Sequence, residues 1–438
     1  MSTPGVAPKR PSAQAARSRE NTLVTIMFFA AGIAFLDRFG IAYAFPYIGP
    51  DLQLDNTQLG WTMSITALCW AVSSIVFSLF SDRLLGGRKK TIIVTSLVLF
   101  SLAAGAVGLA QNFTQLLVIR GIIGALEGPV LPLIQSAVAA ASSEHRRGRN
   151  LGIVIAGTAI IGSALPPILV VSLSESLGWR AVFPLSAAPG LVIALLVAIF
   201  MKESRSTADA PEKPAWRDVG RVLVSRNVLL CGVAAVALIG FTLAFTSFAP
   251  LYLAQNSVLS SGTIATVLSL FGLGGALGCV IAPSWSDRLG RKPVFLLASL
   301  CTALVPIAIL LLHDHAVPLL FSVLLQLLAA GALVIAVYAI PGESVPAPLA
   351  ATTFAVLIAL SEILGGGLAP AVAGALADGF GLSAAMWFCA GLGGLSLVAG
   401  MFVKETRPRR TRPDTAQEPL ALAEESPPLE HPGRTTTT

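Results

Sequence analysis

Apolar and polar positions follow one another along the chain in long blocks. Twelve apolar runs, most near the roughly twenty residues that cross a bilayer as a helix, are separated by short polar stretches. They lie near residues 23–48, 57–80, 91–110, 113–141, 150–173, 179–201, 227–254, 260–284, 293–312, 317–341, 351–376 and 383–403. Because unpaired backbone groups are costly in lipid, each run is predicted to be a helix. The pattern indicates an all-α polytopic membrane protein.

The longest hydrophilic stretch between these runs divides them into six and six. It extends from Lys202 to Arg226 and carries charges of both signs. The predicted organisation is an N-terminal tail (1–22), a six-helix bundle (23–201), a linker (202–226), a second six-helix bundle (227–403) and a C-terminal tail (404–438). The C-terminal tail is rich in Pro, Thr, Glu and Arg, so it is expected to be disordered.

The composition supports this class. Hydrophobic residues make up 55% of the chain and charged residues 12%, about half the charged share of a soluble domain. A water-soluble enzyme is therefore excluded. The net charge of +6 comes from basic residues in loops and tails, where the anionic inner surface of a membrane accounts for them. No nucleic-acid partner is expected; the bilayer is the expected partner.

Lys and Arg collect on one side of the predicted helices. Of the 29, 26 lie in the tails, the linker and alternate loops of one side, and Arg180 alone lies on the other. Positively charged loops stay in the cytoplasm. Both termini are therefore predicted to be cytoplasmic, in the inner membrane of a bacterial cell. Arg38 and Arg120 remain inside the membrane.

A loop motif occurs twice, at equivalent places in the two halves. Ser81–Lys90 follows the second run, and Ser286–Lys292 follows the eighth. Paired six-helix repeats are typical of secondary transporters that move about a central site. The chain here resembles the major facilitator superfamily over residues 23–403, which implies that fold and alternating access. By this resemblance the cytoplasmic gate residues are Asp82, Arg83, Arg88, Asp287, Arg288 and Arg291. The first copy has one extra residue, so it departs from the family pattern.

Five ionisable residues fall within the apolar runs: Asp37, Arg38, Arg120, Glu127 and Glu362. Placing such a side chain at mid-membrane costs at least roughly 2.5–3.5 kcal/mol, so it usually faces a cavity or a partner. Arg120 and Glu127 are seven residues apart, about two turns along one helix face. The five residues form either mutually neutralising pairs that fix helix packing or a titratable cluster. All four histidines lie outside the runs, so a transported proton would need a carboxylate.

Several motifs narrow the resemblance to the anion:cation symporter family. They are Leu36-Asp37-Arg38; Arg120 with Leu126-Glu127-Gly128-Pro129 and Pro132; Glu144-His145-Arg146-Arg147-Gly148-Arg149; and Gly178-Trp179-Arg180 with Phe183. Members of that family carry organic anions, mostly with protons. The resemblance implies that Asp37 and Glu127 carry the proton and that Arg38 engages the substrate anion or its gate. It implies that Arg120 holds one of the two carboxylates in place.

The residues suggest how anion and proton would be coupled. A substrate carboxylate that takes the guanidinium of Arg38 in a bidentate pair removes part of the neutralising charge from the neighbouring carboxylates. Those carboxylates then bind a proton more readily, so each ligand raises the affinity for the other. This positive coupling is the signature of symport.

Aromatic residues recur at helical spacing on two runs. Phe39, Tyr43 and Tyr47 follow one face of the first, and Phe241, Phe245, Phe248 and Tyr252 follow one face of the seventh. These faces either line the cavity or pack against lipid and other helices. The candidate substrate-binding residues are Arg38, Arg120, Tyr43, Tyr47, Phe241, Phe245, Tyr338 and Glu362. Few amide or acidic groups are available in the second half, which favours an aromatic or sparsely substituted carboxylate over a sugar acid.

Glu362 has two interpretations. Near the end of a Gly-rich helix it is expected to contact only backbone or water, and the alternative is a substrate or second-proton role. The resemblance assigns it no function.

Other functional classes remain as alternatives. An efflux antiporter of the same superfamily would carry G-x-x-x-G-P-x-x-G-G in its fifth run, from which Gly157 to Pro167 departs. A receptor with a transporter fold is a second alternative. A membrane enzyme is not expected, because the runs lack His-containing metal motifs and G-x-S-x-G. The five cysteines lack the paired spacing typical of metal ligands, so no metal site is expected. No cofactor and a monomer are expected.

Overall fold

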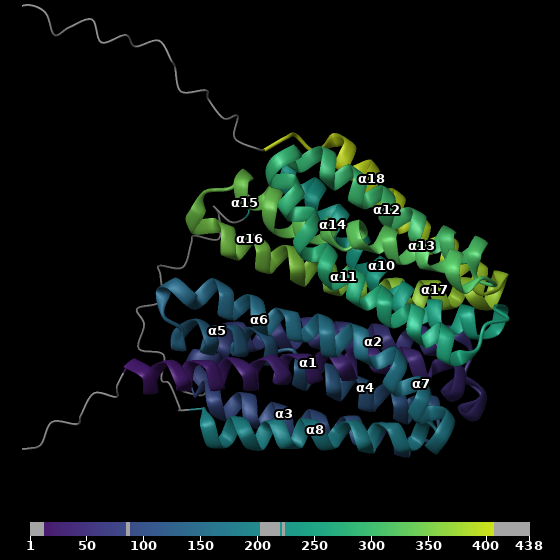
Figure 1. Ribbon diagram of the computed structural model, residues 1–438, viewed down its shortest axis with the longest axis horizontal. Coiled ribbons are helices and arrows are strands. Elements are labelled where there is room, and N and C mark those ends of the chain that lie inside the picture. The colour runs from purple at the N-terminus through teal and green to yellow at the C-terminus, as the bar shows by residue number, and fades with distance from the viewer. Residues whose placement is uncertain (1–12, 85–87, 202–219, 221–223, 407–438) are drawn as a thin grey trace, which may run out of the picture. The chain divides into compact units, whose positions relative to one another are not determined.

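The computed structural model describes residues 13–84, 88–201, 220 and 224–406, without the side chains of residues 13, 15, 16 and 78–84. Within these residues, twelve helical segments are long and apolar enough to cross a membrane. The predicted fold class is thereby confirmed (Figure 1). The expected disordered tail lies outside the described residues from 407 onwards, as does most of the predicted linker.

Two bundles of helices form the fold. The first contains α1 (Ala13–Leu52), α2 (Asn56–Leu84), α3 (Lys89–Ala106), α4 (Phe113–Glu127), α5 (Val130–Ala141), α6 (Arg147–Ala159), α7 (Leu165–Leu177) and α8 (Trp179–Phe200), with short 3₁₀ turns η1 (Val107–Leu109) and η2 (Glu144–Arg146). The second contains α10 (Arg226–Asn256), α11 (Ser261–Leu289), α12 (Arg291–Leu312), α13 (Ala316–Ala329), α14 (Gly331–Val334), α15 (Ile340–Ser344), α16 (Ala347–Leu360), α17 (Gly367–Phe380) and α18 (Leu382–Phe402).

The first helix begins earlier than its apolar run predicts. It starts at Ala13, ten residues before the expected boundary at residue 23. Its polar first turns are held by side-chain contacts, because Glu20 accepts hydrogen bonds from Arg146 (3.4 Å) and Asn150 (2.6 Å). These contacts fix the start of α1 against the loop before α6.

Glycines allow the helices to approach closely. A Cβ added at Gly124 would lie 2.3 Å from the carbonyl oxygen of Thr66 on α2, and one at Gly157 would lie 2.3 Å from that of Phe28 on α1. Small residues at such crossings are how helices pack tightly where lipid supplies no hydrophobic driving force between them.

Three membrane spans contain π-helical turns. They are η3 (Ile160–Ala164), η4 (Ile335–Ala339) and η5 (Ser361–Gly366). Each precedes a proline by a few residues, namely Pro166, Pro341 and Pro370. Proline lacks an N–H and its ring displaces the carbonyl one turn earlier, so the preceding turn widens.

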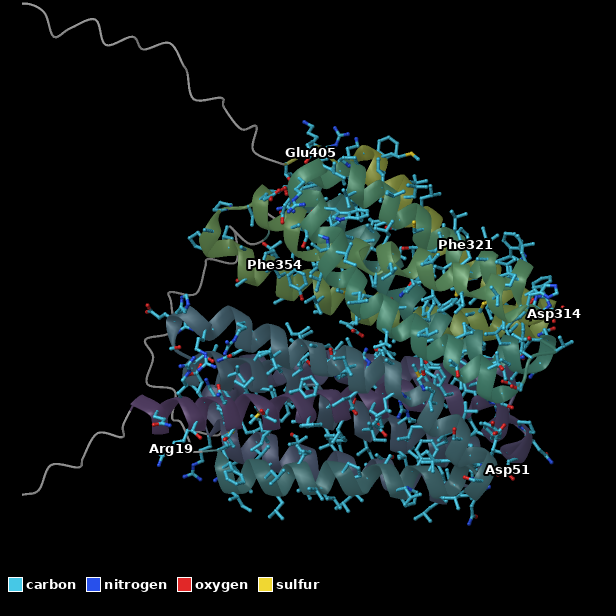
Figure 2. The ribbon with its side chains drawn as sticks, in the orientation of Figure 1. Arg19, Asp51, Asp314, Phe321, Phe354 and Glu405 are labelled. Carbon is cyan, nitrogen blue, oxygen red and sulfur yellow. The ribbon has the colours of Figure 1, made fainter. Side chains whose placement is uncertain are left out.

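The two ends of the bundles differ in charge. We call the side with Arg19 and Glu405 the basic side, and the side with Asp51 and Asp314 the opposite side (Figure 2). The basic residues that begin α3, α6 and α12 lie on the basic side. In Figure 1 the ribbons of α5 and α6 stand apart from those of α15 and α16 at their basic ends.

The bundles meet in the middle and at the opposite side. Helix α2 packs along α17, α1 along α10, and α11 along α7 and η3. A Cβ at Gly60 would lie 2.2 Å from the carbonyl oxygen of Pro370. Near the end of α17, Asp378 accepts hydrogen bonds from the backbone N–H groups of Asn56 (2.9 Å) and Thr57 (2.8 Å). Its carboxylate therefore joins the two bundles at that side.

Candidate functional site

Five charged side chains are buried among the residues that the structure describes. They are Asp37, Arg38, Arg120, Glu127 and Glu362, the same five that stand out in the sequence. Three elements supply them: α1 carries the first two, α4 the next two and η5 the last. Three carboxyl groups thus face two guanidinium groups within the membrane-spanning part of the protein. Fully ionised, this cluster has one excess negative charge.

Arg120 fixes the cluster to the middle of α1. Its side chain has no exposed surface. Nη1 donates to Oδ2 of Asp37 (3.2 Å) and to the carbonyl oxygen of the same residue (3.5 Å), and Nη2 donates to the carbonyl oxygen of Arg38 (3.2 Å). One planar guanidinium therefore neutralises a carboxylate and satisfies backbone acceptors at once, which an ammonium group could not do with the same geometry.

Glu127 brings a second carboxyl group to the same place. It lies at the end of α4, with 2% of its surface exposed, and interacts with the carboxyl group of Asp37. Oε1 of Glu127 and Oδ1 of Asp37 have no hydrogen-bond partner in the structure. Two adjacent buried carboxyls form an arrangement that can hold a proton, because both cannot be charged without repulsion.

Arg38 points to the other bundle. Its Nη2 donates to Oε2 of Glu362 at 2.5 Å, and both side chains are less than one-tenth exposed. The guanidinium carbon lies 4.9 Å from the centre of the Trp70 ring and 5.9 Å from that of Phe35. Cation–π contacts of this kind favour a desolvated guanidinium. The expectation that Glu362 contacts only backbone or water is wrong, because the π turn η5 directs it across the bundle interface to Arg38.

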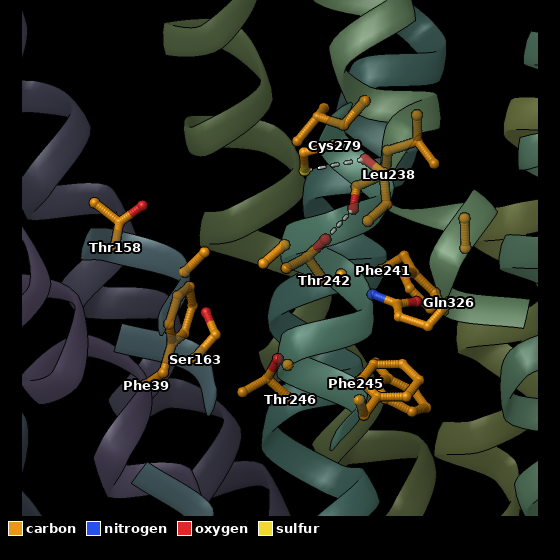
Figure 3. Close-up of a pocket in the computed structure, with 18 of the residues that line it drawn as sticks. Phe39, Thr158, Ser163, Leu238, Phe241, Thr242, Phe245, Thr246, Cys279 and Gln326 are labelled. Carbon is orange, nitrogen blue, oxygen red and sulfur yellow. Dashed lines mark hydrogen bonds between the residues drawn. The ribbon is translucent and has the colours of Figure 1, made fainter. Parts of the chain in front are cut away.

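Beside this cluster lies a cavity of about 250 Å³ between the two bundles. Figure 3 shows Phe39, Thr158 and Ser163 on one wall, with Gln326, Phe241 and Phe245 across from them. The rings of Phe241 and Phe245 are stacked at 5.3 Å, and Phe271 stacks on Phe245 at 4.9 Å. The wall of the second bundle is therefore a continuous aromatic surface.

The predicted aromatic stripes divide between cavity and core. Tyr43, Phe241 and Phe245 line the cavity. Phe248 and Tyr252 are buried in the core, and Tyr252 packs on His313 with ring centres 5.6 Å apart. One stripe thus serves both of the interpretations that the sequence left open.

Five of the eight predicted substrate-binding residues do not line the cavity: Arg38, Arg120 and Glu362 belong to the charge cluster, and Tyr47 and Tyr338 lie elsewhere. Tyr47 is half-buried near Glu175, and Tyr338 is 46% exposed with its ring packed on that of Phe354 at 5.3 Å. Neither lines this cavity. A substrate in this cavity would therefore not contact either tyrosine.

Phe35 connects the cavity with the charge cluster. It lines the cavity, and its ring also faces the guanidinium of Arg38. Helical spacing carries a signal for it, because Phe35 precedes Phe39 and Tyr43 at intervals of four. Trp70 has no comparable signal, since its role depends on how α2 meets α1.

Gln326 places an amide in the aromatic wall. It lines the cavity from α13, and its Oε1 has no hydrogen-bond partner in the structure. A buried amide oxygen without a partner is uncommon and usually marks a place for a ligand or water. Thr242 differs, because its hydroxyl already donates to the carbonyl oxygen of Leu238 (2.9 Å).

The second loop motif forms a network on the basic side. Arg291 pairs with Asp287 (2.6 Å) and with Glu343 at the end of α15 (2.7 Å). The carboxylate of Glu405 accepts hydrogen bonds from the backbone N–H groups of Arg291 (2.9 Å) and Lys292 (3.0 Å), where a helix N-terminus favours negative charge. The network ties α11, α12 and α15 together within the second bundle.

The remaining predicted gate residues are less informative. Arg88 and Arg288 are exposed. The side chains of Asp82 and Arg83 lie outside the described residues, so the predicted gate contacts of these two residues have no described geometry. Within the described part of the chain, no group of three or more His, Cys, Asp or Glu residues could hold a metal ion.

Residues 27–258 and 230–433 match the family model of the Major Facilitator Superfamily. Among curated relatives, a protein of Bacillus subtilis named as a hexuronate transporter is 29% identical over 63% of this chain and 66% of its own length. One of Cupriavidus pinatubonensis, named as a probable 4-methylmuconolactone transporter, is 26% identical over 59% and 61%. The matched stretch thus spans less than two thirds of these two relatives.

A relative of a different kind matches over more of the chain. The multidrug resistance protein MdtG of Serratia proteamaculans is 27% identical over 88% of this chain and 96% of its own length. Among solved structures, the nucleoside transporter NupG superposes with a TM-score of 0.73 at 15% identity, covering 87% of this chain and 98% of that one. This second likeness concerns the fold.

Proposed function

The chain belongs to the Major Facilitator Superfamily, and from its buried charge cluster we propose that it takes up an organic anion together with protons by alternating access. Like the relatives it matches, it is a transporter and not an enzyme. The observation that carries the proposal is the pair of interacting buried carboxyls, Asp37 and Glu127, of which Asp37 is ion-paired with Arg120. Structural neutralisation alone would need only one carboxylate there.

Each residue of the cluster has a distinct role in this proposal. Asp37 and Glu127 hold the proton, and Arg120 keeps Asp37 in place. Arg38 binds the carboxylate of the substrate, for which its guanidinium offers a bidentate edge. An anion that approaches Arg38 adds negative charge to a cluster that already has an excess, so proton and anion bind with positive coupling.

The cavity supports a substrate with an apolar body. Its stacked phenyl rings provide contact area, while Gln326 and the hydroxyl of Ser163 offer a few hydrogen bonds. We therefore favour an aromatic or sparsely substituted carboxylate. The relatives are named for transport of two kinds of substrate: hexuronate, which is hydroxylated, and 4-methylmuconolactone, which is sparsely substituted.

The charge distribution supports an orientation. Positively charged loops stay in the cytoplasm, so we place the basic side there, with both termini, in the inner membrane of a bacterial cell. The contacts between α2 and α17 at the opposite side then close the external entrance. With that entrance closed, the conformation in this proposal is inward-facing.

Efflux of small organic compounds in exchange for protons is the second candidate. The observation that favours it is the MdtG relative, which matches most of the chain. The lining of the cavity, which contains no charged side chain among its described residues, is compatible with a neutral compound. The sequence lacks the motif expected in the fifth span of an efflux antiporter, which makes efflux the less favoured candidate.

A liposome assay separates the two candidates. Purified protein is reconstituted with an internal pH-sensitive dye, and benzoate, pyruvate and glucuronate are added outside one at a time. Symport predicts internal acidification with at least one of them, strongly reduced in Glu127→Gln and unchanged in Glu175→Gln, a control on the exposed face of α7. Proton movement only with lipophilic cations, and none with any carboxylate, would contradict symport and support efflux.

A further inference from the structure

We propose that Glu362 is a second proton-coupling residue, which takes up a proton when the carboxylate of the substrate displaces it from Arg38. This inference rests on the proposed anion transport. In this proposal Glu362 competes with the substrate for Arg38 and does not itself bind the substrate.

The geometry leaves one polar edge of Arg38 for an anion. Trp70 and Phe35 face its guanidinium, and in the described structure its side chain donates a hydrogen bond to Glu362 at 2.5 Å. A substrate carboxylate that binds Arg38 in a bidentate pair needs the same donors. Substrate and Glu362 therefore compete for one guanidinium.

The surroundings of Glu362 do not stabilise a free carboxylate. Its side chain is 9% exposed. A Cβ at Gly366 would lie 3.0 Å from Oε2 of Glu362, 2.9 Å from Leu243 and 3.1 Å from Ala67, so aliphatic groups of α10 and α2 surround this position. A carboxylate left unpaired in such surroundings neutralises by binding a proton, because an isolated buried charge is too costly.

Among the described residues, the other titratable groups on helices that pack against η5 lie away from Glu362. Cys69 of α2 faces Gly121, and Cys231 of α10 is packed in the core of the second bundle. Tyr252 of α10 packs on His313, and Asp378 of α17 binds Asn56 and Thr57. Arg38 is the charged group that pairs with Glu362, and Arg38 also interacts electrostatically with Glu127.

The exchange is balanced in charge and protons. The ion pair of Arg38 with the Glu362 carboxylate, one substrate carboxylate and one proton become an ion pair of Arg38 with the substrate and a neutral Glu362 acid. No bond other than the O–H of Glu362 forms. When the substrate leaves, Glu362 releases the proton and returns to Arg38. Because the ion pair joins the two bundles, each exchange also opens and closes a contact between α1 and η5.

The test counts protons on binding. Anion binding to the detergent-purified full chain is measured by titration calorimetry in buffers of different ionisation enthalpy, with the carboxylate that acidifies liposomes, chosen from benzoate, pyruvate and glucuronate. The background is Glu127→Gln, which removes one member of the neighbouring carboxyl pair. We expect uptake of about one proton per anion in this background, because one carboxylate is displaced.

The second variant then removes the proposed acceptor. Glu127→Gln/Glu362→Gln is expected to take up no proton and to bind the anion more tightly at alkaline pH, since no carboxylate competes for Arg38. Glu127→Gln/Glu362→Asp is expected to restore proton uptake, and Glu127→Gln/Glu175→Gln is expected to behave as Glu127→Gln. Difference infrared spectra of the otherwise wild-type chain give a second readout: anion addition should produce a protonated-carboxyl band that Glu362→Gln lacks.

Two results would overturn the inference. Equal proton uptake with and without Glu362 would place the proton elsewhere. Loss of anion binding in a folded Glu362→Gln chain would make this residue a substrate ligand. If the proposed function itself is wrong, no carboxylate binds to the wild-type protein or moves protons through it. That outcome differs from both of the results above.

Discussion

Arg120 has no exposed surface, and its described hydrogen bonds all go to two consecutive residues of α1. Removing it would leave the carboxyl group of Asp37 without its ion-pair partner, beside the carboxyl group of Glu127. Breaking a buried ion pair by removing one partner is far more costly than breaking an exposed one, because the remaining charge stays desolvated.

The prediction at this position concerns stability. Arg120→Ala should destabilise the protein by about 3–5 kcal/mol, and Arg120→Lys by less, because a single ammonium group keeps the charge but not all the acceptors. Arg180→Ala, which removes an exposed pair with Asp51, should cost about 1 kcal/mol or less. Thermal unfolding of the purified variants in one detergent measures all three. Equal stability of Arg120→Ala and Arg180→Ala would contradict the prediction.

The sequence predicts which charges are buried but not all of their partners. Asp37, Arg38, Arg120, Glu127 and Glu362 stand out because an ionisable residue in an apolar run is costly. The pair of Arg38 and Glu362 joins positions 324 apart in sequence, on helices whose contact depends on the packing of two bundles. Local spacing carries no signal for such a pair.

At the scale of a helix, the π turn η5 sets the direction of Glu362. Its glycines let it lie directly on α10: a Cβ at Gly365 would be 2.2 Å from the carbonyl oxygen of Val236. Backbone cannot yield as a flexible side chain does, so an added methyl group would push η5 away from α10 and move Glu362 relative to Arg38.

Gly365→Ala should therefore reduce transport strongly and destabilise the protein by about 1–3 kcal/mol, the usual cost of overpacking. Gly391→Ala on α18 is the matched control, because a Cβ there meets no atom within 4 Å. It should leave both properties near their original values. Uptake in liposomes and thermal unfolding check the pair, and wild-type uptake by Gly365→Ala would show that the position of η5 does not matter.

The apolar runs predict the spans, whereas the interruptions within them escape detection. The run at 113–141 reads as continuous, yet its helix is divided at Gly128 and Pro129 into α4 and α5. Prolines signal a disturbance near η3, η4 and η5. They do not tell whether the helix kinks, breaks or widens, because that depends on which neighbours accept the displaced carbonyl groups.

At the scale of the whole molecule, Asp378 holds the bundles together at the opposite side. Its carboxylate accepts four hydrogen bonds, from the backbone N–H groups of Asn56 and Thr57 and from both of their side chains. Each is worth about 0.5–1.5 kcal/mol. An alternating-access cycle requires this contact to open, so it contributes directly to the balance between the two conformations.

Asp378→Ala should shift the balance towards opening at that side, by about tenfold for each 1.4 kcal/mol lost. Spin labels on Leu177 of α7 and Phe380 of α17, both exposed, report the separation of the bundles in a chain whose native cysteines have been replaced. A longer or broader distance distribution is expected.

Asp314→Ala provides the control for this shift. Asp314 accepts a hydrogen bond from Val258 within the second bundle, so its loss should leave the distribution unchanged. An unchanged distribution in Asp378→Ala as well would show that other contacts between α2 and α17 keep the side closed.

The most direct test of proton-coupled anion uptake is accumulation driven by a pH gradient alone. Liposomes containing the protein, acidic outside and alkaline inside, receive the radiolabelled carboxylate that gave acidification in the dye assay. Proton-coupled uptake predicts accumulation above the external concentration, and a protonophore should abolish it. In Glu127→Gln, accumulation should fall steeply while exchange of labelled for unlabelled anion persists. Accumulation that survives both the protonophore and this substitution would contradict the account.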